Sequence, residues 1–205
     1  MIVAITNIAG SGKTLFLTRQ AKTYDIIFSN YKLNEKYFPN KKIYYVKDIE
    51  DFFKYDYISF IRNIKKKDPK KNVILAVDEA GLFFPSIQYK QMSSSFLYLF
   101  NQHRKLGIDF YYTVQNMSLV HKALKVNTQY TYYISHLLWF FYYSVWDRYH
   151  IGKKGSLLWR GFFLATDIDY QSYDTTEMLA GASWYIESVK EVANSSGKKI
   201  ILRTL

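Results

Sequence analysis

The feature that most constrains this fold is an apolar run that leads into a glycine-rich loop and then into a helical stretch. Residues 2–6 (IVAIT) are typical of a short, buried parallel strand. The loop NIAGSGKT, residues 7–14, places Gly10 and Gly12 where a backbone can turn its N–H groups inward. Residues 13–22 then read as a helix with apolar side chains to bury. This order predicts a phosphate-binding loop between a strand and a helix.

The residue types in this loop suit the phosphates of a nucleotide. Lys13 would place a cation on the β- and γ-phosphates, and Thr14 would offer its hydroxyl to magnesium. The positive end of the following helix also favours phosphate. The residues predicted to contact the nucleotide are Asn7, Ala9, Gly10, Ser11, Gly12, Lys13 and Thr14. The alternative is a glycine-rich turn that carries a lysine by chance.

The loop departs from the usual pattern at Asn7, where its first glycine is expected. Asparagine enters left-handed backbone conformations more readily than other non-glycine residues. We therefore expect Asn7 to be tolerated in the loop and expect Asn7→Gly to be nearly neutral for nucleotide binding.

The rest of the chain alternates strand and helix patterns. Further strands are predicted at residues 24–30, 41–47, 72–80 and 108–116, and helices at 48–64 and 93–107. Asp48 is the expected N-cap of the first of these helices, and the charged turn at 65–71 ends it. Such alternation predicts an α/β fold with a mostly parallel sheet flanked by helices. A length of 205 residues fits one domain, 1–205.

Two acids close the most apolar of these strands, VILAVDEA. Ligands gather at the carboxyl ends of parallel strands, so Asp78 could hold magnesium together with Thr14. Glu79 could orient and activate a water for attack on the γ-phosphate. If the strand ending at Gln115 lies beside this one, its amide would reach the γ-phosphate region and sense that phosphate. The alternatives are solvated acids and an ordinary strand-end glutamine.

Composition narrows the choice of partners. The formal net charge is +11, which favours a polyanion or an anionic membrane. Cysteine is absent, which excludes disulfides and thiolate chemistry, and the four histidines show no ligand spacing, so we predict no structural metal. The amino terminus has no signal-peptide pattern, and the apolar run at residues 132–146 is too short to span a bilayer. We therefore predict no transmembrane segment.

The segment from Gln129 to Ala165 consists of two long aromatic runs around a basic turn. We predict a β-hairpin insertion with Lys153, Lys154 and Gly155 near its tip. Its rings could stack on the bases of single-stranded nucleic acid, or could pack on the sheet or on a neighbouring subunit. A C-terminal helix and tail are expected at 175–205.

Taken together, these motifs resemble the FtsK/HerA class of P-loop ATPases. Within that class the chain is most similar to the zonula occludens toxin-like (Zot) ATPases of filamentous phages and to the genome-packaging ATPases of membrane-containing icosahedral viruses. The resemblance rests on DEAGLFFPS (78–86), HRKLGIDFYYTVQN (103–116) and YDTTEM (173–178), and spans roughly residues 1–180. It implies a RecA/FtsK-like P-loop NTPase fold. Zot-like proteins usually carry a membrane helix after the ATPase domain, and this sequence shows none. We therefore expect either a soluble packaging motor or only the cytoplasmic part of a longer protein.

The resemblance also assigns roles to single residues. Lys13, Thr14, Asp78, Glu79 and Gln115 take the family's loop-lysine, magnesium-site, water-activating and sensor positions. Motors of this class usually add an arginine from the neighbouring subunit. The family's HR pair falls on His103 and Arg104, close to the expected edge of the site, so Arg104 is our candidate for that role, with Arg148 second.

The predicted function is an ATP-hydrolysing motor that translocates viral DNA during genome packaging. The expected cofactors are ATP and Mg²⁺, and the expected partners are viral DNA, copies of the chain in a hexameric ring, and capsid or membrane-embedded viral proteins. One alternative is a Zot-like ATPase that drives phage extrusion at the inner membrane. Others are a nucleotide-dependent switch or a small-molecule kinase, although no lid or acceptor site is recognisable. The expected location is the host cytoplasm or the virion, or peripherally at the inner membrane.

Overall fold

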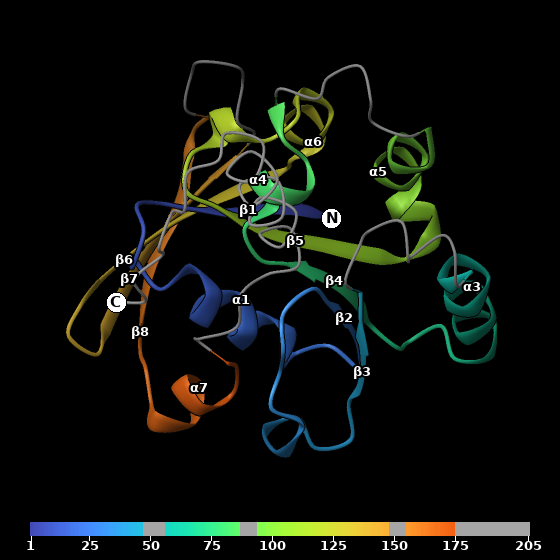
Figure 1. The fold of residues 1–205 in the computed structure, drawn as a ribbon, viewed down its shortest axis with the longest axis horizontal. Helices are drawn as coiled ribbons and strands as arrows, with labels where there is room; N and C mark the ends of the chain where they lie inside the picture. The colour runs from blue at the N-terminus through green and yellow to red at the C-terminus, as the bar shows by residue number, and fades with distance from the viewer. Residues whose placement is uncertain (47–55, 87–93, 148–154, 175–205) are drawn as a thin grey trace, which may run out of the picture.

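One eight-stranded sheet runs through the protein in the order β3-β2-β4-β5-β1-β6-β7-β8 (Figure 1). The computed structural model describes residues 1–46, 56–86, 94–147 and 155–174. The strands are β1 (Ile2–Thr6), β2 (Ile26–Ser29), β3 (Lys42–Tyr45), β4 (Val73–Val77), β5 (Ile108–Val114), β6 (Tyr130–Leu137), β7 (Phe140–Asp147) and β8 (Leu157–Leu164). Strands β3 to β6 in this order pair in parallel, whereas β7 and β8 are antiparallel. The mostly parallel α/β fold is confirmed.

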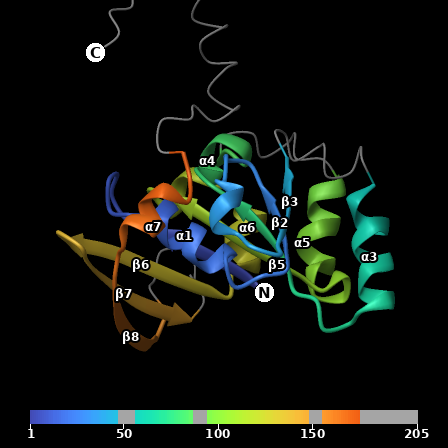
Figure 2. The same ribbon diagram turned by 90° about the horizontal axis from the view of Figure 1, so that it is seen from below.

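Helices cover both faces of this sheet because successive strand side chains point to opposite sides. Ile2 and Ala4 of β1 join one core cluster, whereas Val3 and Ile5 join the other. The first cluster includes side chains of α3 (Tyr57–Lys67), α5 (Ser94–Leu106) and α6 (Lys122–Asn127), and the second is built on α1 (Lys13–Ala21). Figure 2 shows α3 and α5 side by side, at the end of the sheet away from β8. Short helices α4 (Ala80–Phe83), α7 (Asp167–Gln171), Glu35–Tyr37 and Met117–Leu119 complete the described elements.

The helix predicted at residues 48–64 begins later than expected. Asp56 has a left-handed backbone (φ 47°, ψ 39°), and its side chain accepts a hydrogen bond from Ser59 N at 3.3 Å, so it is the N-cap of α3. A continuous helix through residue 56 is therefore wrong, and Asp48 lies outside the described residues. The helix also continues through Lys67 rather than ending in a turn before it.

The aromatic segment contains one more turn than the sequence indicated. Its first run folds back at Leu138 and Trp139, so that β6 and β7 form a hairpin, and β7 and β8 form a second one around the basic turn. Lys153 and Lys154 lie outside the described residues. On the inner face, Phe16 of α1 lies 5.3 to 5.8 Å from the rings of Tyr132, Tyr143 and Phe163. These inner rings pack on the protein's own helix, whereas Phe140, Tyr142 and Phe162 on the other face are exposed.

Helix α7 is fastened to α1 by one buried carboxylate. Asp169 accepts hydrogen bonds from the Thr166 N–H and hydroxyl, both at 3.0 Å, and forms ion pairs with Arg19 (3.2 Å) and Lys22 (3.5 Å). Burial opposes ionisation of Asp169, but these hydrogen bonds and cations outweigh it and lower its pKa.

None of the described helices combines the length and apolar character that crossing a membrane would require.

Replacing Asp169 by Asn should lower the free energy of unfolding at pH 7 by about 2 kcal/mol, because it removes a charge-assisted cap and two ion pairs. The Asp169 contribution is present above the unfolded pKa of about 4 and is lost as pH falls through the lowered folded pKa. Urea titrations should therefore show a difference between the proteins that shrinks below about pH 4. Asp167→Asn, an exposed acid in the same helical turn, should cost less than about 1 kcal/mol. Equal losses for both variants would contradict this assignment.

Candidate nucleotide-binding site

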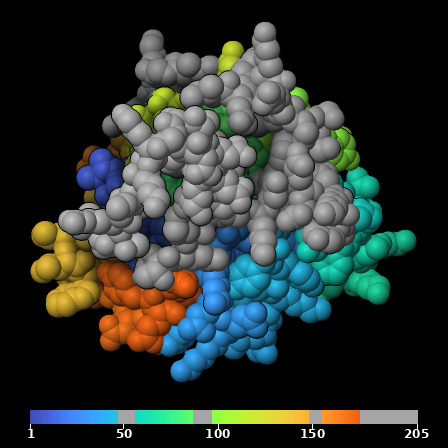
Figure 3. Space-filling model, in the orientation of Figure 1, coloured from blue at the N-terminus to red at the C-terminus, as the bar shows by residue number. Residues whose placement is uncertain are grey.

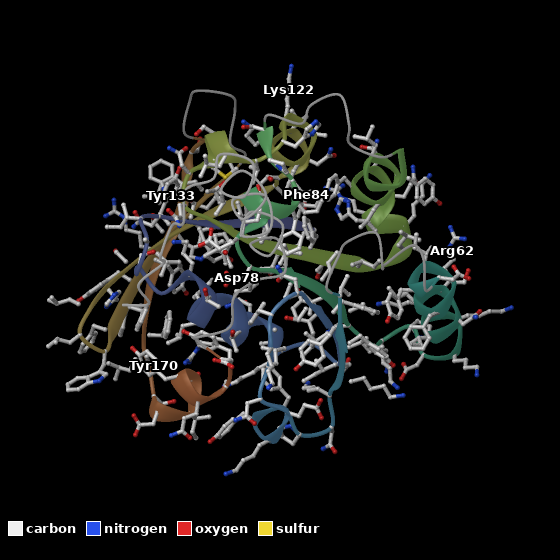
Figure 4. The ribbon with its side chains drawn as sticks, viewed as in Figure 1. Arg62, Asp78, Phe84, Lys122, Tyr133 and Tyr170 are labelled. Carbon is white, nitrogen blue, oxygen red and sulfur yellow. The ribbon has the colours of Figure 1, made fainter. Side chains whose placement is uncertain are left out.

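The predicted site residues meet at one edge of the sheet because parallel strands end together there. Thr6 pairs with Val114 and Val77 pairs with Tyr112, so the loop after β1 and the residues after β4 and β5 emerge side by side. Asp78 follows β4 and lies near the amino end of α1 (Figure 4). This register brings the predicted loop, the two acids and Gln115 to a common edge of the sheet.

The phosphate loop needs glycine at two positions for different reasons. Gly10 (φ 73°) and Gly12 (φ 85°) both have left-handed backbone angles that other residues rarely adopt. Gly10 has open space around it, whereas a Cβ on Gly12 would lie 2.1 Å from Cε1 of Phe141. The ring of Phe141, from β7, thus packs directly against the loop backbone.

Lys13 holds the loop closed on itself. Its Nζ donates to the carbonyl oxygens of Asn7 (3.0 Å) and Ile8 (2.9 Å), so the ammonium sits inside the curve of the loop. Burial lowers the pKa of Lys13, and the nearby carboxylates of Glu79 and Asp78 oppose that shift. A phosphate entering the loop would offer this buried cation a stronger, anionic partner.

Asn7 is accommodated for a reason that the sequence did not reveal. Non-glycine residues with positive φ among the described residues are Asn40, Asp56, Glu79 and Leu138, so Asn7 is not left-handed and the expected reason for its tolerance is wrong. Instead its side-chain amide donates to the Ile134 carbonyl of β6 at 2.7 Å, and its side-chain oxygen accepts from Ile8 N at 2.9 Å. Asn7 therefore ties the loop to the neighbouring strand, a contact that a glycine could not make.

Asp78 is a buried carboxylate held between two hydroxyls. The Thr14 hydroxyl donates to its two oxygens at 3.1 and 3.0 Å, and the Thr113 hydroxyl donates to the first of them. Burial raises the pKa of Asp78, and the Thr113 and Thr14 hydrogen bonds oppose that rise. A cation at this point would stabilise the ionised form.

Thr14 and Asp78 fit a magnesium site, because Mg²⁺ binds to oxygen ligands and takes several of them from phosphate and water. Two side chains do not complete an octahedron, and within the described ranges no group of three or more His, Cys, Asp or Glu side chains could hold a metal. The remaining ligands would be those of a bound nucleotide and its water.

Glu79 is positioned by its own backbone. It is held in a left-handed conformation (φ 49°, ψ 54°), and its N–H donates to the Thr113 hydroxyl at 2.8 Å. Asn30, which follows β2, exchanges two hydrogen bonds with the backbone of Asp78, at 2.7 and 2.9 Å. Sequence reasoning missed Asn30, which directly follows β2, and Thr113, which lies near the end of β5. Together these contacts aim two consecutive carboxylates at the cavity.

Two predicted residues, Gln115 and Arg104, are not part of the lining of this cavity. The Gln115 side chain is exposed at the same edge, where its backbone carbonyl accepts from the Thr6 hydroxyl at 3.4 Å. Arg104 ends α5 just before β5 begins, which places it at the opposite edge of the sheet from the loop. There its guanidinium lies beside the side-chain amide of Gln129. The expectation that Arg104 lies close to its own subunit's site is therefore wrong.

The loop and the two acids line a cavity of about 400 Å³, within the range of small-molecule sites. Additional lining residues that the sequence did not indicate are Leu15, Tyr31, His136, Phe141, Tyr170, Tyr173 and Asp174. His136 Nε2 lies 2.8 Å from the Gly10 carbonyl oxygen, and its ring stacks on Phe141 at 5.0 Å between centroids. The β6–β7 hairpin thus forms one wall of the site.

The family of the chain follows from its sequence. The model of the zonular occludens toxin (Zot) family matches residues 5–162, which include the loop, both acids and most of the hairpin region. The chain belongs to the Zot family. No curated protein sequence matches it.

Solved structures show the same fold. The N-terminal domain of zonular occludens toxin from Neisseria meningitidis superposes with a TM-score of 0.57 at 20% identity, covering 84% of this Zot-family chain and 98% of that one. The genome packaging NTPase B204 from Sulfolobus turreted icosahedral virus 2, in complex with ATP-gammaS, gives 0.51 at 14% identity, covering 72% and 92%. A DnaB-like replicative helicase gives 0.51 at 14% identity, covering 81% and 55%. The P-loop NTPase fold predicted from the motifs is confirmed.

Asp78→Asn should stabilise the metal-free protein at pH 7 while removing its response to magnesium. A carboxyl whose folded pKa is raised stabilises the fold at low pH and loses that contribution as pH rises through the folded value. The variant should therefore melt about 2–4 °C higher at pH 7 and equal the wild type near pH 4. Calorimetry with EDTA, or with ATP and Mg²⁺, would measure both effects. A lower melting temperature at pH 7, or an unchanged magnesium response, would contradict it.

Proposed function

We propose that this Zot-family protein is a motor subunit that hydrolyses ATP to move viral DNA during virion assembly. The observation that carries the proposal is the meeting of the Thr14 hydroxyl and the Asp78 carboxylate, 3.0 Å apart, beside a closed phosphate loop with Glu79 next in the chain. Support comes from the shared fold of B204, which is described as a genome packaging NTPase. A homo-oligomeric ring with ATP and Mg²⁺ is part of the proposal.

The residues divide the reaction among them. Lys13 and the loop N–H groups hold the β- and γ-phosphates, and Thr14 with Asp78 would hold Mg²⁺, which supplies charge neutralisation when bound. Glu79 accepts a proton from a water whose oxygen attacks the γ-phosphorus. As that P–O bond forms, the bond to the bridging oxygen of ADP breaks, and inorganic phosphate leaves. A carboxylate that lines the cavity beside the phosphate loop, where it could activate a water, favours hydrolysis over the kinase alternative.

The net charge of +11 suits DNA, whose phosphates attract a basic surface. A second candidate is the same hydrolysis used for extrusion of a filamentous phage at the inner membrane, which the family match favours. Both candidates move DNA or the phage particle that contains it, and both therefore need repeated turnover of ATP. A nucleotide-dependent switch, which binds a partner without processive work, would not need repeated turnover.

Glu79→Gln should keep ATP bound but slow hydrolysis by about 10²–10⁴-fold, since it removes the proton acceptor and keeps the shape of the side chain. Lys13→Ala should abolish ATP binding itself, because the phosphates lose their main cation. Steady-state phosphate release and calorimetric ATP binding separate the two effects.

Adding double-stranded or single-stranded DNA should raise the wild-type rate of ATP hydrolysis, and this stimulation should decrease as the salt concentration is increased.

If neither form of DNA changes the wild-type rate of ATP hydrolysis, the motor proposal is contradicted. The nucleotide-dependent switch and the small-molecule kinase would then remain as alternatives. Normal hydrolysis by Glu79→Gln would move the proton acceptor to another group. Lys13→Ala protein that still binds ATP would remove the phosphate loop from the site altogether.

Arg104 is proposed to complete a neighbouring subunit's site, because its place at the far edge of the sheet leaves it out of its own. Arg104→Ala should bind ATP normally yet hydrolyse it about 10³-fold or more slowly. Mixing it with Lys13→Ala protein, which is inactive in its own site but keeps Arg104, should recover activity in mixed rings. Sedimentation would confirm that rings form, and no recovery in such rings would exclude Arg104. A protein that remains monomeric with ATP and DNA would contradict the motor.

A further inference from the structure

The nucleotide cavity extends beyond the phosphate loop and beyond Thr14 and Asp78, the side chains that fit a magnesium site. It continues to Tyr31, Tyr170 and Tyr173, with Asp174 beside them, and these residues come from segments far apart in the chain. Tyr170 lies on α7 (Figure 4), and Tyr173 and Asp174 follow that helix directly. Tyr173 and Asp174 open the YDTTEM stretch that the proposed hydrolysis mechanism leaves without a role.

Two ends of the cavity carry aromatic rings, and only one offers a ring face to a ligand. At the hairpin end, Phe141 is 2% exposed, packed against Gly12 and stacked on Phe163 at 5.0 Å. His136 at that end already faces the loop carbonyl of Gly10. At the other end the Tyr170 side chain is 39% exposed. The accessible aromatic surface of the cavity is therefore on the α7 side.

The α7 side is held rigidly in place. Besides the contacts of Asp169, the backbone after α7 is joined to the segment after β2: Leu33 and Tyr173 form an antiparallel bridge, and Asp174 N donates to the Lys32 carbonyl at 3.2 Å. Figure 3 shows these two segments, orange and blue, side by side on the surface. A binding wall that is already ordered loses little entropy when a ligand arrives.

The hydroxyl of Tyr173 remains a hydrogen-bond donor throughout the physiological range. Burial raises the pKa of Tyr173 to about 12, and the neighbouring Asp78 carboxylate and Tyr170 act in the same direction. Tyr173 lines the cavity together with Thr14, Asp78 and Tyr170. It therefore stands where a ligand leaving the phosphate loop towards α7 would pass.

We infer that Tyr170 and Tyr173 bind the nucleoside half of the triphosphate, with the tyrosine rings against base and ribose and Asp174 accepting a hydrogen bond from a nucleoside donor. The inference rests on the proposed function, because it requires the triphosphate to occupy the loop. Every base has a π face, so a tyrosine wall selects a nucleotide over a bare polyphosphate without choosing one base.

Calorimetry with two ligands, Mg·ATP and Mg·tripolyphosphate, tests this assignment, since tripolyphosphate fills the loop but has no nucleoside. Tyr170→Ala should weaken ATP binding by about 5- to 150-fold and change tripolyphosphate binding by less than about twofold. Tyr170→Phe should retain wild-type ATP binding because the ring remains. Tyr142→Ala, at a 51% exposed tyrosine of β7 outside the cavity, should leave both affinities unchanged.

The outcomes separate the inference from the proposed function. If the wild type binds neither ligand, the proposed function fails and the inference fails with it. If the wild type binds both, but Tyr170→Ala and the double variant with Tyr173→Ala keep full ATP affinity, only the inference is overturned. Equal weakening of both ligands would show that the rings support the loop rather than the nucleoside, and would overturn it too.

Discussion

The site depends on one carboxylate that is costly to bury. Asp78 lies at the end of β4, under the amino end of α1, and its pKa is raised by that burial. The hydroxyls of Thr14 and Thr113 offset part of the cost, and in doing so they join α1, β4 and β5 at a single point. The residue that destabilises the empty protein is thus the one that also fixes the relative positions of the phosphate loop and the acids. A bound cation would relieve the remaining cost.

The sheet order determines what surrounds this carboxylate. Strand β1 lies between β5 and β6, so the loop that leaves it is flanked by the acids on one side and by the aromatic hairpin on the other. The hairpin supplies Phe141 against Gly12 and His136 against Gly10. Helix α7, fastened to α1 through Asp169, supplies a second wall through Tyr170. The phosphate loop is therefore one short stretch of sequence, whereas the walls beside it come from the last third of the described chain.

This division explains what the sequence could predict. Lys13, Thr14 and Asp78 stand in short patterns whose chemistry is local, and their meeting follows from the parallel strands alone. Asn30 and His136 reach the site through the strand order, which no short pattern encodes.

Three predictions made from the sequence were wrong for physical reasons that short sequence patterns do not reveal. A helix between two parallel strands returns the chain to the amino edge, so Arg104, at the end of such a helix, had to lie away from the loop. Asp56 interrupts an apolar pattern of helical spacing because its side chain caps a new helix better than it continues an old one. Asn7 was expected to be tolerated because of its backbone freedom. Its actual contact is a side-chain hydrogen bond to the Ile134 carbonyl of β6, on a strand 127 residues later in the chain.

The central place of β1 has a consequence for how the protein forms during synthesis. Its partner strands begin at Ile108 (β5) and Tyr130 (β6), so neither exists when the five residues of β1, four of them apolar, are made. At ribosomal rates of about 5–20 residues per second, β1 waits on the order of ten seconds for a partner. Until then it is an unpaired apolar segment that other chains can bind. The nucleotide loop, suspended between β1 and α1, is complete only once the later strands have been translated and have closed on both sides of it.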